Sequence, residues 1–115
     1  MSQDDKPFAL VVRFMVRSGC EAEFDQLVKN TVVQIFRNEP GVMRYLCYEV
    51  DGQPQQRVFY QEYESRAAFE EHEAQEHTRQ FLEASEPLLE GSDVYPLTLM
   101  AGGFRGPHPA VPTNG

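Results

Sequence analysis

The spacing of hydrophobic and polar residues changes several times along the chain, and each change predicts a new element. Residues 8–17 (FALVVRFMVR) hold the unbroken apolar run Leu10–Val11–Val12, which favours a central strand covered on both of its faces or a strand at an interface. Residues 21–38 repeat apolar side chains at the spacing of one helical face. Pro40 and Gly41 then predict that this helix ends near Asn38, because the residue before a proline disfavours helical backbone.

The next part of the pattern is typical of a β-hairpin. Residues 42–50 (VMRYLCYEV) alternate in the manner of a strand, and the polar loop of residues 51–56 begins with the turn signal Asp51-Gly52. Residues 57–64 are rich in aromatic and β-branched side chains, which strands prefer. The two segments therefore predict a pair of antiparallel strands.

Helical spacing returns at Ser65, whose hydroxyl makes it a good N-cap. The helical pattern continues to about Leu89, with an expected interruption near Gln75-Glu76. Residues 93–101 (DVYPLTLMA) predict a last strand, in which Pro96 marks an edge or a bulge because proline cannot donate a hydrogen bond to a neighbouring strand.

The resulting order is strand, helix, strand, strand, helix, strand. This is the ferredoxin-like βαββαβ arrangement of the α+β class, an antiparallel sheet with its helices on one face. The other face would be bare and apolar, so we expect two copies to pack their sheet faces together as a homodimer. We place this domain at residues 8–101, between a flexible N-terminus at residues 1–7 and a flexible tail at residues 102–115.

Composition narrows the range of functions. The chain has 10 Lys and Arg against 18 Asp and Glu, a net charge of −8, so neither nucleic acid nor an anionic membrane is an expected partner. No signal peptide is visible and no apolar run approaches the length of a membrane span, so the expected compartment is the cytoplasm. In a reducing compartment the two cysteines are expected to be free thiols.

Candidate catalytic chemistry gathers in the strand–helix unit of residues 57–81. His72 and His77 are five residues apart, which on an unbroken helix turns their side chains by about 140°. The zinc-protease motif needs a spacing of four, so we expect no metal site. If a helix break directs both rings into one cleft, either imidazole could accept a phenolic proton; otherwise the rings would bond backbone carbonyls at the break. Phe69 and Phe81 would form pocket wall or core.

The strand before that helix supplies further candidates for substrate contact. Tyr60 and Glu62 lie on one side of the strand and Tyr63 on the other, so Glu62 and Tyr63 cannot line one cleft without a bulge. Either tyrosine could stack on a flat substrate and donate a hydrogen bond, or could be an ordinary core aromatic. Glu62 could orient a histidine, or pair with Arg44 or Arg13 across the sheet.

This segment resembles the signature of the antibiotic biosynthesis monooxygenase family. The family pattern is a strand ending in Glu-x-aromatic, a helix cap, a small and an apolar residue, a histidine, and a second histidine five residues later. The residues that carry the resemblance are Tyr60-Gln61-Glu62-Tyr63-Glu64-Ser65, Ala68-Phe69, His72, His77 and Phe81, and Glu39-Pro40-Gly41 is similar to the family's turn. The resemblance covers about residues 8–101 and implies a dimeric α+β barrel.

The resemblance also implies a range of activities. Some relatives are cofactor-free oxygenases of phenolic polyketides or quinols, in which the substrate supplies the electrons for dioxygen. Others degrade haem, process bacterial signalling sugars, or have no known activity. Haem degradation is not expected, because residues 8–17 lack the asparagine of that branch and His72 stands in the place of its tryptophan.

The hypothesis that follows is a monooxygenase that needs no cofactor and oxidises an aromatic phenol or quinol with dioxygen. His72 or His77 would accept the proton, and Tyr63 and Tyr60 would shape the pocket and orient the substrate. Two alternatives stay open. The chain could isomerise or process a small polar metabolite on the same scaffold, or it could be a non-catalytic dimeric binding or stress-response module.

Overall fold

The structure, a computed structural model, describes residues 6–106 of the 115-residue chain. Its elements are β1 (Phe8–Val16), α1 (Glu21–Asn38), β2 (Val42–Val50), β3 (Gln53–Tyr63), α2 (Arg66–Glu73), α3 (Glu76–Ser85), the 3-10 helix η2 (Glu86–Leu88) and β4 (Leu89–Leu97). The strands form one antiparallel sheet in the order β2-β3-β1-β4. This arrangement confirms the predicted ferredoxin-like α+β fold, with the second helix divided into α2 and α3.

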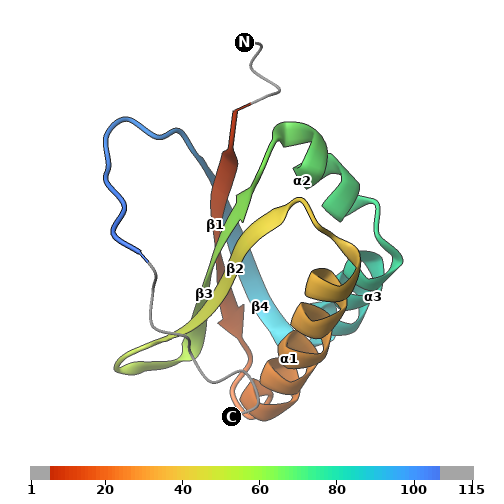
Figure 1. Cartoon of the computed structure of the whole chain (residues 1–115). Coiled ribbons are helices and arrows are strands. Elements are labelled where there is room, and N and C mark those ends of the chain that lie inside the picture. Colours follow the sequence, from red (N-terminus) through yellow and green to blue (C-terminus); the bar gives the residue numbers. More distant parts are fainter. Residues whose placement is uncertain (1–5, 107–115) are drawn as a thin grey trace.

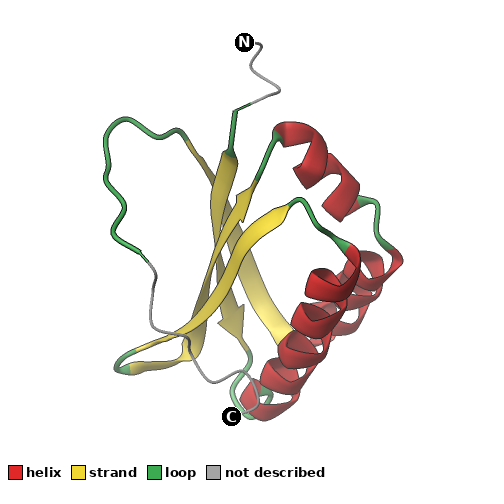
Figure 2. Cartoon of the chain, viewed as in Figure 1, coloured by secondary structure: helices red, strands yellow, loops and turns green. Residues whose placement is uncertain are grey.

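The helices all lie against one face of the sheet, which is the right-hand face in Figures 1 and 2. On β1 the side chains that point toward the helices are buried apolar residues, namely Leu10, Val12, Phe14 and Val16. The ring of Phe14 packs against Phe24 of α1 and Phe59 of β3, with centroid distances of 5.3 and 4.7 Å. Full burial of each such side chain contributes about 1.5–3 kcal/mol, so this layer joins the helices to the sheet.

The hairpin between β2 and β3 is tighter than predicted. β3 begins at Gln53 rather than at residue 57, so Asp51 and Gly52 alone form the turn, with Gly52 at a φ of +78°. The pairing of β3 with β1 stops at Gln56. Pro54 therefore lies in the part of β3 that extends beyond β1, where its missing N–H is not needed.

The boundary between the last helix and the last strand was predicted four residues too late. The helical pattern ends at Ser85, η2 follows with Pro87 in it, and β4 runs from Leu89 to Leu97. Gly91 lies in β4 opposite Met15 and beside a bulge. The expected helix interruption is confirmed between α2 and α3, and Pro96 does lie on an edge strand.

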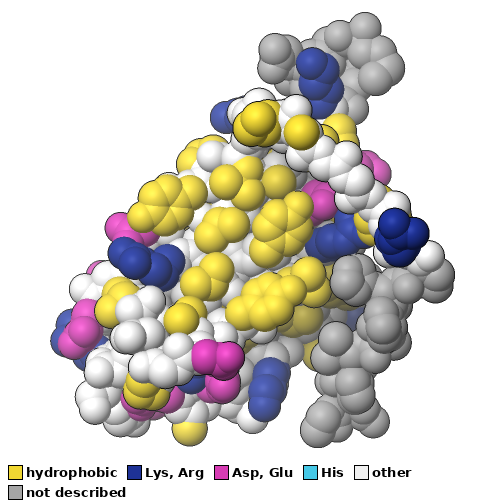
Figure 3. Space-filling model, turned by 90° about the vertical axis from the view of Figure 1, so that its left-hand side faces the viewer, with side chains coloured by type: hydrophobic (Ala, Val, Ile, Leu, Met, Phe, Trp, Pro, Cys, Tyr) yellow, Lys and Arg dark blue, Asp and Glu magenta, His cyan; other side chains and the backbone are white. Residues whose placement is uncertain are grey.

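The face of the sheet that carries no helix, which we call the open face, exposes a patch of apolar side chains (Figure 3). Paired residues of antiparallel strands share a face, so Leu46, Tyr60, Val11 and Tyr95 lie side by side across the four strands. The exposed large side chains on this face are Leu46, Tyr48, Tyr95 and Leu97. The predicted bare apolar face is therefore present.

Residues 98–106, which follow β4 without helix or strand, pass over to the opposite edge of the sheet, on the open-face side in Figure 1. There the ring of Phe104 lies 5.0 Å from the guanidinium carbon of Arg44 on β2. The rest of the predicted tail, residues 107–115, lies outside the described residues, as do residues 1–5 of the predicted N-terminus. No helix among residues 6–106 is long and apolar enough to cross a membrane.

Candidate functional site

Three helical segments meet at the side chain of Glu39. Glu39 directly follows α1, and its backbone N–H donates to the carbonyl of Ile35 at 2.9 Å. His72 lies in the last turn of α2, and His77 is the second residue of α3. The Glu39 side chain is only 4% exposed, so its carboxylate needs hydrogen-bond donors from the protein.

Both histidines supply those donors. Nδ1 of His72 lies 2.8 Å from Oε1 of Glu39, and Nε2 of His77 lies 2.5 Å from Oε2. The break between α2 and α3 thus directs both rings to one carboxylate. The break does bring both rings to one target, but that target is a buried carboxylate, and a cleft shared by the two rings stays a prediction. Among the described residues both rings bond this side chain rather than a backbone carbonyl. We call these three residues the Glu39 cluster.

Local packing explains why the turn after α1 can come so close to α2. A Cβ atom on Gly41 would lie 2.7 Å from Cβ of Ala68, so no larger residue fits there without a shift of the backbone. The backbone N–H of Glu64 donates to the carbonyl of Gly41 at 2.9 Å, and the Ser65 hydroxyl caps α2 by accepting from the N–H of Ala68. The predicted N-cap at Ser65 is confirmed, and it places α2 beside Glu39.

Two tyrosines cover His72 from the sheet. The ring centroids of Tyr45 on β2 and Tyr63 on β3 lie 5.8 and 5.4 Å from the imidazole centroid. The Tyr63 hydroxyl donates to Oε1 of Gln61 at 2.6 Å. Burial raises the pKa of Tyr45 and Tyr63 well above the usual value of a phenol, and the nearby Glu39 carboxylate adds to this effect. Both hydroxyls therefore stay protonated and can only donate or accept neutral hydrogen bonds.

The ring nitrogens that do not face Glu39 are the chemically available ones. Within residues 6–106, Nε2 of His72 and Nδ1 of His77 make no hydrogen bond. The side chains of His72 and His77 are only 7% and 12% exposed. Each unbonded ring nitrogen is a possible proton acceptor.

The remaining predicted site residues do not join this cluster. Tyr60 and Glu62 lie on the open face, where the Tyr60 hydroxyl donates to Oε1 of Glu62 at 2.9 Å and Arg44 donates to Oε2 at 3.1 Å. The predicted pairing of Glu62 with Arg44 is confirmed. Partial burial and the adjacent Glu62 raise the pKa of Tyr60. The sheet therefore separates Tyr60 and Glu62 from Tyr63 and the two histidines.

The two predicted phenylalanines belong to the core. Phe81 is buried and packs against Phe14 and Phe24, with ring centroids 6.2 and 6.0 Å apart. Phe69 is partly buried and packs against Phe8 and Tyr63 at 4.8 and 5.2 Å. Phe69 therefore supports the ring of Tyr63, whereas Phe81 lies in the layer between α1, α3 and the sheet.

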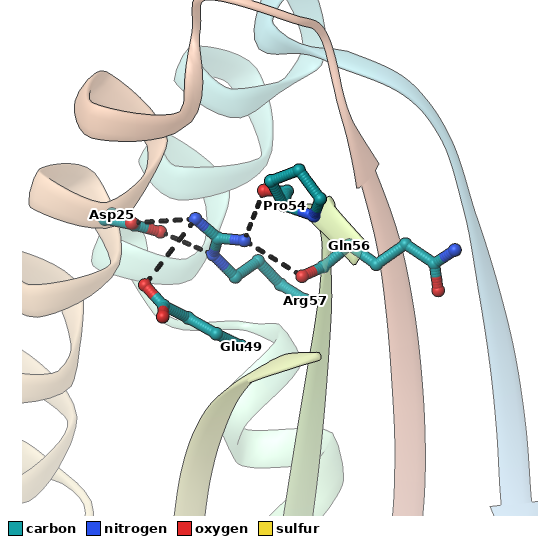
Figure 4. Close-up of polar contacts among 5 residues, drawn as sticks. All are labelled: Asp25, Glu49, Pro54, Gln56 and Arg57. Carbon is teal, nitrogen blue, oxygen red and sulfur yellow. Dashed lines mark hydrogen bonds and ion pairs between the residues drawn. The ribbon is translucent and has the colours of Figure 1, made fainter. Parts of the chain in front are cut away.

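A second buried polar cluster, formed by Arg57 and its partners, lies near the start of α1 (Figure 4). Arg57 donates from Nε and Nη2 to the two oxygens of Asp25 at 2.8 and 3.0 Å, and from Nη1 to the carbonyls of Pro54 and Gln56 at 2.9 Å. Its side chain is 7% exposed. The bidentate contact with Asp25 raises the pKa of Arg57 further, so its charge is permanent.

Two cavities open to the surface away from the histidines. The larger, about 420 Å³, lies beside Arg57 and is lined by Glu21, Glu49, Val50, Asp51, Gly52, Pro54 and Arg57. The other, about 330 Å³, lies between the end of α3 and β4 and is lined by Phe14, Leu82, Ser85, Glu86, Leu89, Glu90, Gly91 and Ser92. Neither is lined by a residue of the Glu39 cluster.

No metal centre is found within residues 6–106, because no three metal-ligating side chains lie together with suitable geometry. Cys20 and Cys47 are both free, as expected. Cys20 precedes α1 without capping it through its side chain. The sequence analysis missed Glu39 as a site residue, although its position in the Glu39-Pro40-Gly41 turn was noted.

The fold and the cluster define a small α+β protein with a carboxylate–imidazole site. Residues 7–84 match the family model described as antibiotic biosynthesis monooxygenase, so the chain belongs to this family. A comparison with curated proteins gave no match.

Solved structures with the same fold come from several bacteria. A candidate antibiotic biosynthesis monooxygenase from Bacteriodes thetaiotaomicron VPI-5482 superimposes with a TM-score of 0.81 at 17% identity, over 90% of this chain and 99% of that one. Rv0793 from Mycobacterium tuberculosis gives a TM-score of 0.78 at 25% identity, over 86% of this chain and 100% of that one. PA3566 from Pseudomonas aeruginosa gives 0.77 at 20% identity, over 87% and 100%.

Proposed function

We propose that this protein is a cofactor-independent monooxygenase of a phenol or quinol. For a para-hydroquinone the balanced reaction consumes one dioxygen and gives a hydroxyquinone and water. The substrate loses four electrons, and dioxygen gains them as one oxygen atom enters the ring and the other leaves as water. The single observation that carries the proposal is the Glu39 cluster, in a member of a monooxygenase family.

The protein's contribution in this reaction is to remove a proton from the substrate. An electron-rich phenolate passes electrons to dioxygen far more readily than the neutral phenol does. A carboxylate that holds the N–H side of an imidazole leaves the other ring nitrogen free to accept a proton, which is the logic of a general base. We place the substrate beside the acceptor nitrogens, with Tyr45 as a neutral, apolar contact, while the fully buried Tyr63 supports the ring of His72 from the sheet.

The test is oxygen consumption with a set of hydroquinones, such as 1,4-dihydroxynaphthalene. We expect uptake above the uncatalysed rate, and a loss of at least about 100-fold in the variants His72→Gln and His77→Gln, because general-base catalysis typically contributes 10²–10⁴-fold. Gln80→Ala is a matched control on the exposed side of α3. Equal uptake by the wild type and both histidine variants would contradict the proposal.

The same cluster could also move a proton without oxygen, because one imidazole can accept a proton while the other donates one. An isomerase of a small polar metabolite is therefore the second candidate. Incubation of the hydroquinones and of small hydroxyketones under nitrogen separates the two functions. Turnover that requires oxygen supports the monooxygenase, whereas turnover of a hydroxyketone under nitrogen supports the isomerase.

We further propose that the protein works as a homodimer through the open faces, in the cytoplasm, where its two cysteines stay reduced. The apolar patch of Figure 3 supports a second copy as its partner, because each copy presents the same patch.

Analytical ultracentrifugation tests the proposed homodimer. Tyr95→Asp is expected to raise the dimer dissociation constant at least about 100-fold, since it buries an unpaired charge. Phe36→Asp on α1 is the control, because Phe36 and Tyr95 are 53% and 50% exposed.

A further inference from the structure

We propose that Glu39 is a positioning residue that holds His72 and His77 in opposite tautomers. The catalytic value of this arrangement depends on the function proposed above. The tautomers do not, and they can be measured without a substrate.

The tautomers follow from the atoms that face the carboxylate. An ionised carboxylate has no hydrogen to donate, so each ring nitrogen beside it must carry one. His72 presents Nδ1 to Glu39, whereas His77 presents Nε2. His72 is therefore the Nδ1–H tautomer with a free lone pair on Nε2, and His77 is the Nε2–H tautomer with a free lone pair on Nδ1. One carboxylate thus fixes two different acceptor atoms.

The proton-transfer step can then be written in full. The O–H bond of the substrate breaks, an N–H bond forms at the free ring nitrogen of one histidine (Nε2 of His72 or Nδ1 of His77), and the electron pair stays on the substrate oxygen as a phenolate. The resulting imidazolium keeps its other N–H bond to Glu39, which becomes a stronger, charge-assisted hydrogen bond. The second histidine keeps the carboxylate aligned from the other side.

The experiment is nitrogen NMR of the imidazole rings in uniformly ¹⁵N-labelled protein, with His72→Gln and His77→Gln used to assign the signals. At neutral pH we expect one ring protonated at Nδ1 and the other at Nε2. Two rings of the same tautomer would overturn the proposal using the wild-type protein alone.

Glu39→Gln tests the positioning role directly. A glutamine offers one acceptor oxygen and one donor NH₂ group, so one ring must change its tautomer to accept from it. The control is Glu73→Gln, which removes the same charge next to His72 from an exposed side chain and should leave both tautomers unchanged. Unchanged tautomers in a folded Glu39→Gln variant would contradict the proposal. Correct tautomers in a protein that consumes no oxygen would contradict only the proposed function.

Discussion

The Arg57 cluster and the Glu39 cluster hold the two ends of α1, and they do so with different chemistry. Asp25, in the second turn of α1, accepts two hydrogen bonds from Arg57, and Glu39, just beyond the last turn, accepts one from each histidine. Each cluster joins α1 to a distant segment through a nearly buried carboxylate or guanidinium. Both are therefore expected to stabilise the fold.

The difference lies in what each cluster can still do once it has formed. Nε, Nη1 and Nη2 of Arg57 all donate to protein oxygens, and the guanidinium keeps its charge at any pH that the fold survives. The histidines each leave one ring nitrogen without a hydrogen bond in the described part of the chain, and each can gain a proton. The comparison shows that the candidate site is distinguished by ring nitrogens that can still accept a proton. Burial and charge alone do not distinguish it, because both clusters have them.

The largest expected effect is the removal of Asp25. Asp25→Ala leaves the buried Arg57 guanidinium without its bidentate partner. We expect the free energy of unfolding to fall by about 2–3 kcal/mol. This is a small loss for a broken buried ion pair, because Asp25 is itself partly exposed. Urea denaturation measures this loss. An unchanged midpoint would mean that the cluster does not hold α1.

The Glu39 cluster should be less costly to break. Glu39→Ala removes the acceptor of two hydrogen bonds but also removes a carboxylate from a desolvated site, so we expect a loss of about 1–2 kcal/mol in the free energy of unfolding. The same denaturation experiment measures it. If Glu39→Ala lowers the free energy of unfolding more than Asp25→Ala does, the Glu39 cluster contributes more to stability than the Arg57 cluster.

The tyrosines beside His72 predict a dependence of stability on alkaline pH. Their pKa values are raised in the folded protein, so the stabilisation is complete below pH 10, the usual pKa of a tyrosine, and falls as the pH rises above it. The loss should approach about 1.4 kcal/mol per pH unit for each tyrosine. Tyr45→Phe should make the decline above pH 10 less steep, as measured by urea denaturation at several pH values, whereas an equal slope would contradict this origin.

The smallest effect is expected at Glu49, which approaches Arg57 from solvent. Its Oε1 lies 3.8 Å from Nη2 of Arg57, and its side chain is 76% exposed. Glu49→Ala should therefore change the free energy of unfolding by less than about 0.5 kcal/mol, as is usual for exposed ion pairs. A loss close to that of Asp25→Ala would show that the bidentate contact is not what stabilises Arg57.

The fold was largely predictable because local patterns determine it. The apolar run of β1, the helical spacing of α1 and the Ser65 cap each use neighbouring residues, and each was found where it was expected. The start of β4 was not, because Gly91 and Ser92 suggest a helix end by composition, while their pairing with β1 is a long-range contact. Similarly, the position of Pro54 beyond the end of β1 depends on how far two strands overlap.

The candidate site was predictable only in part. The expected helix break pointed to a shared cleft for both rings, whereas their five-residue spacing on an unbroken helix would have turned them apart. The target itself, Glu39, is separated from His72 by 33 residues, and no periodicity connects them. Tyr60 and Glu62 were grouped with the site because they are close in sequence, yet strand alternation places them on the opposite face from Tyr63.

The close approach at Gly41 gives position 41 a diagnostic value. A methyl group there would collide with Ala68, so a relative with any other residue at this position must carry its second helix farther from the turn. The distance between the carboxylate and the first histidine would then grow, and the shared hydrogen bonds would be lost. A glycine immediately after Glu-Pro is thus a marker by which uncharacterised chains with the same carboxylate–imidazole arrangement can be selected from sequence data before any coordinates exist.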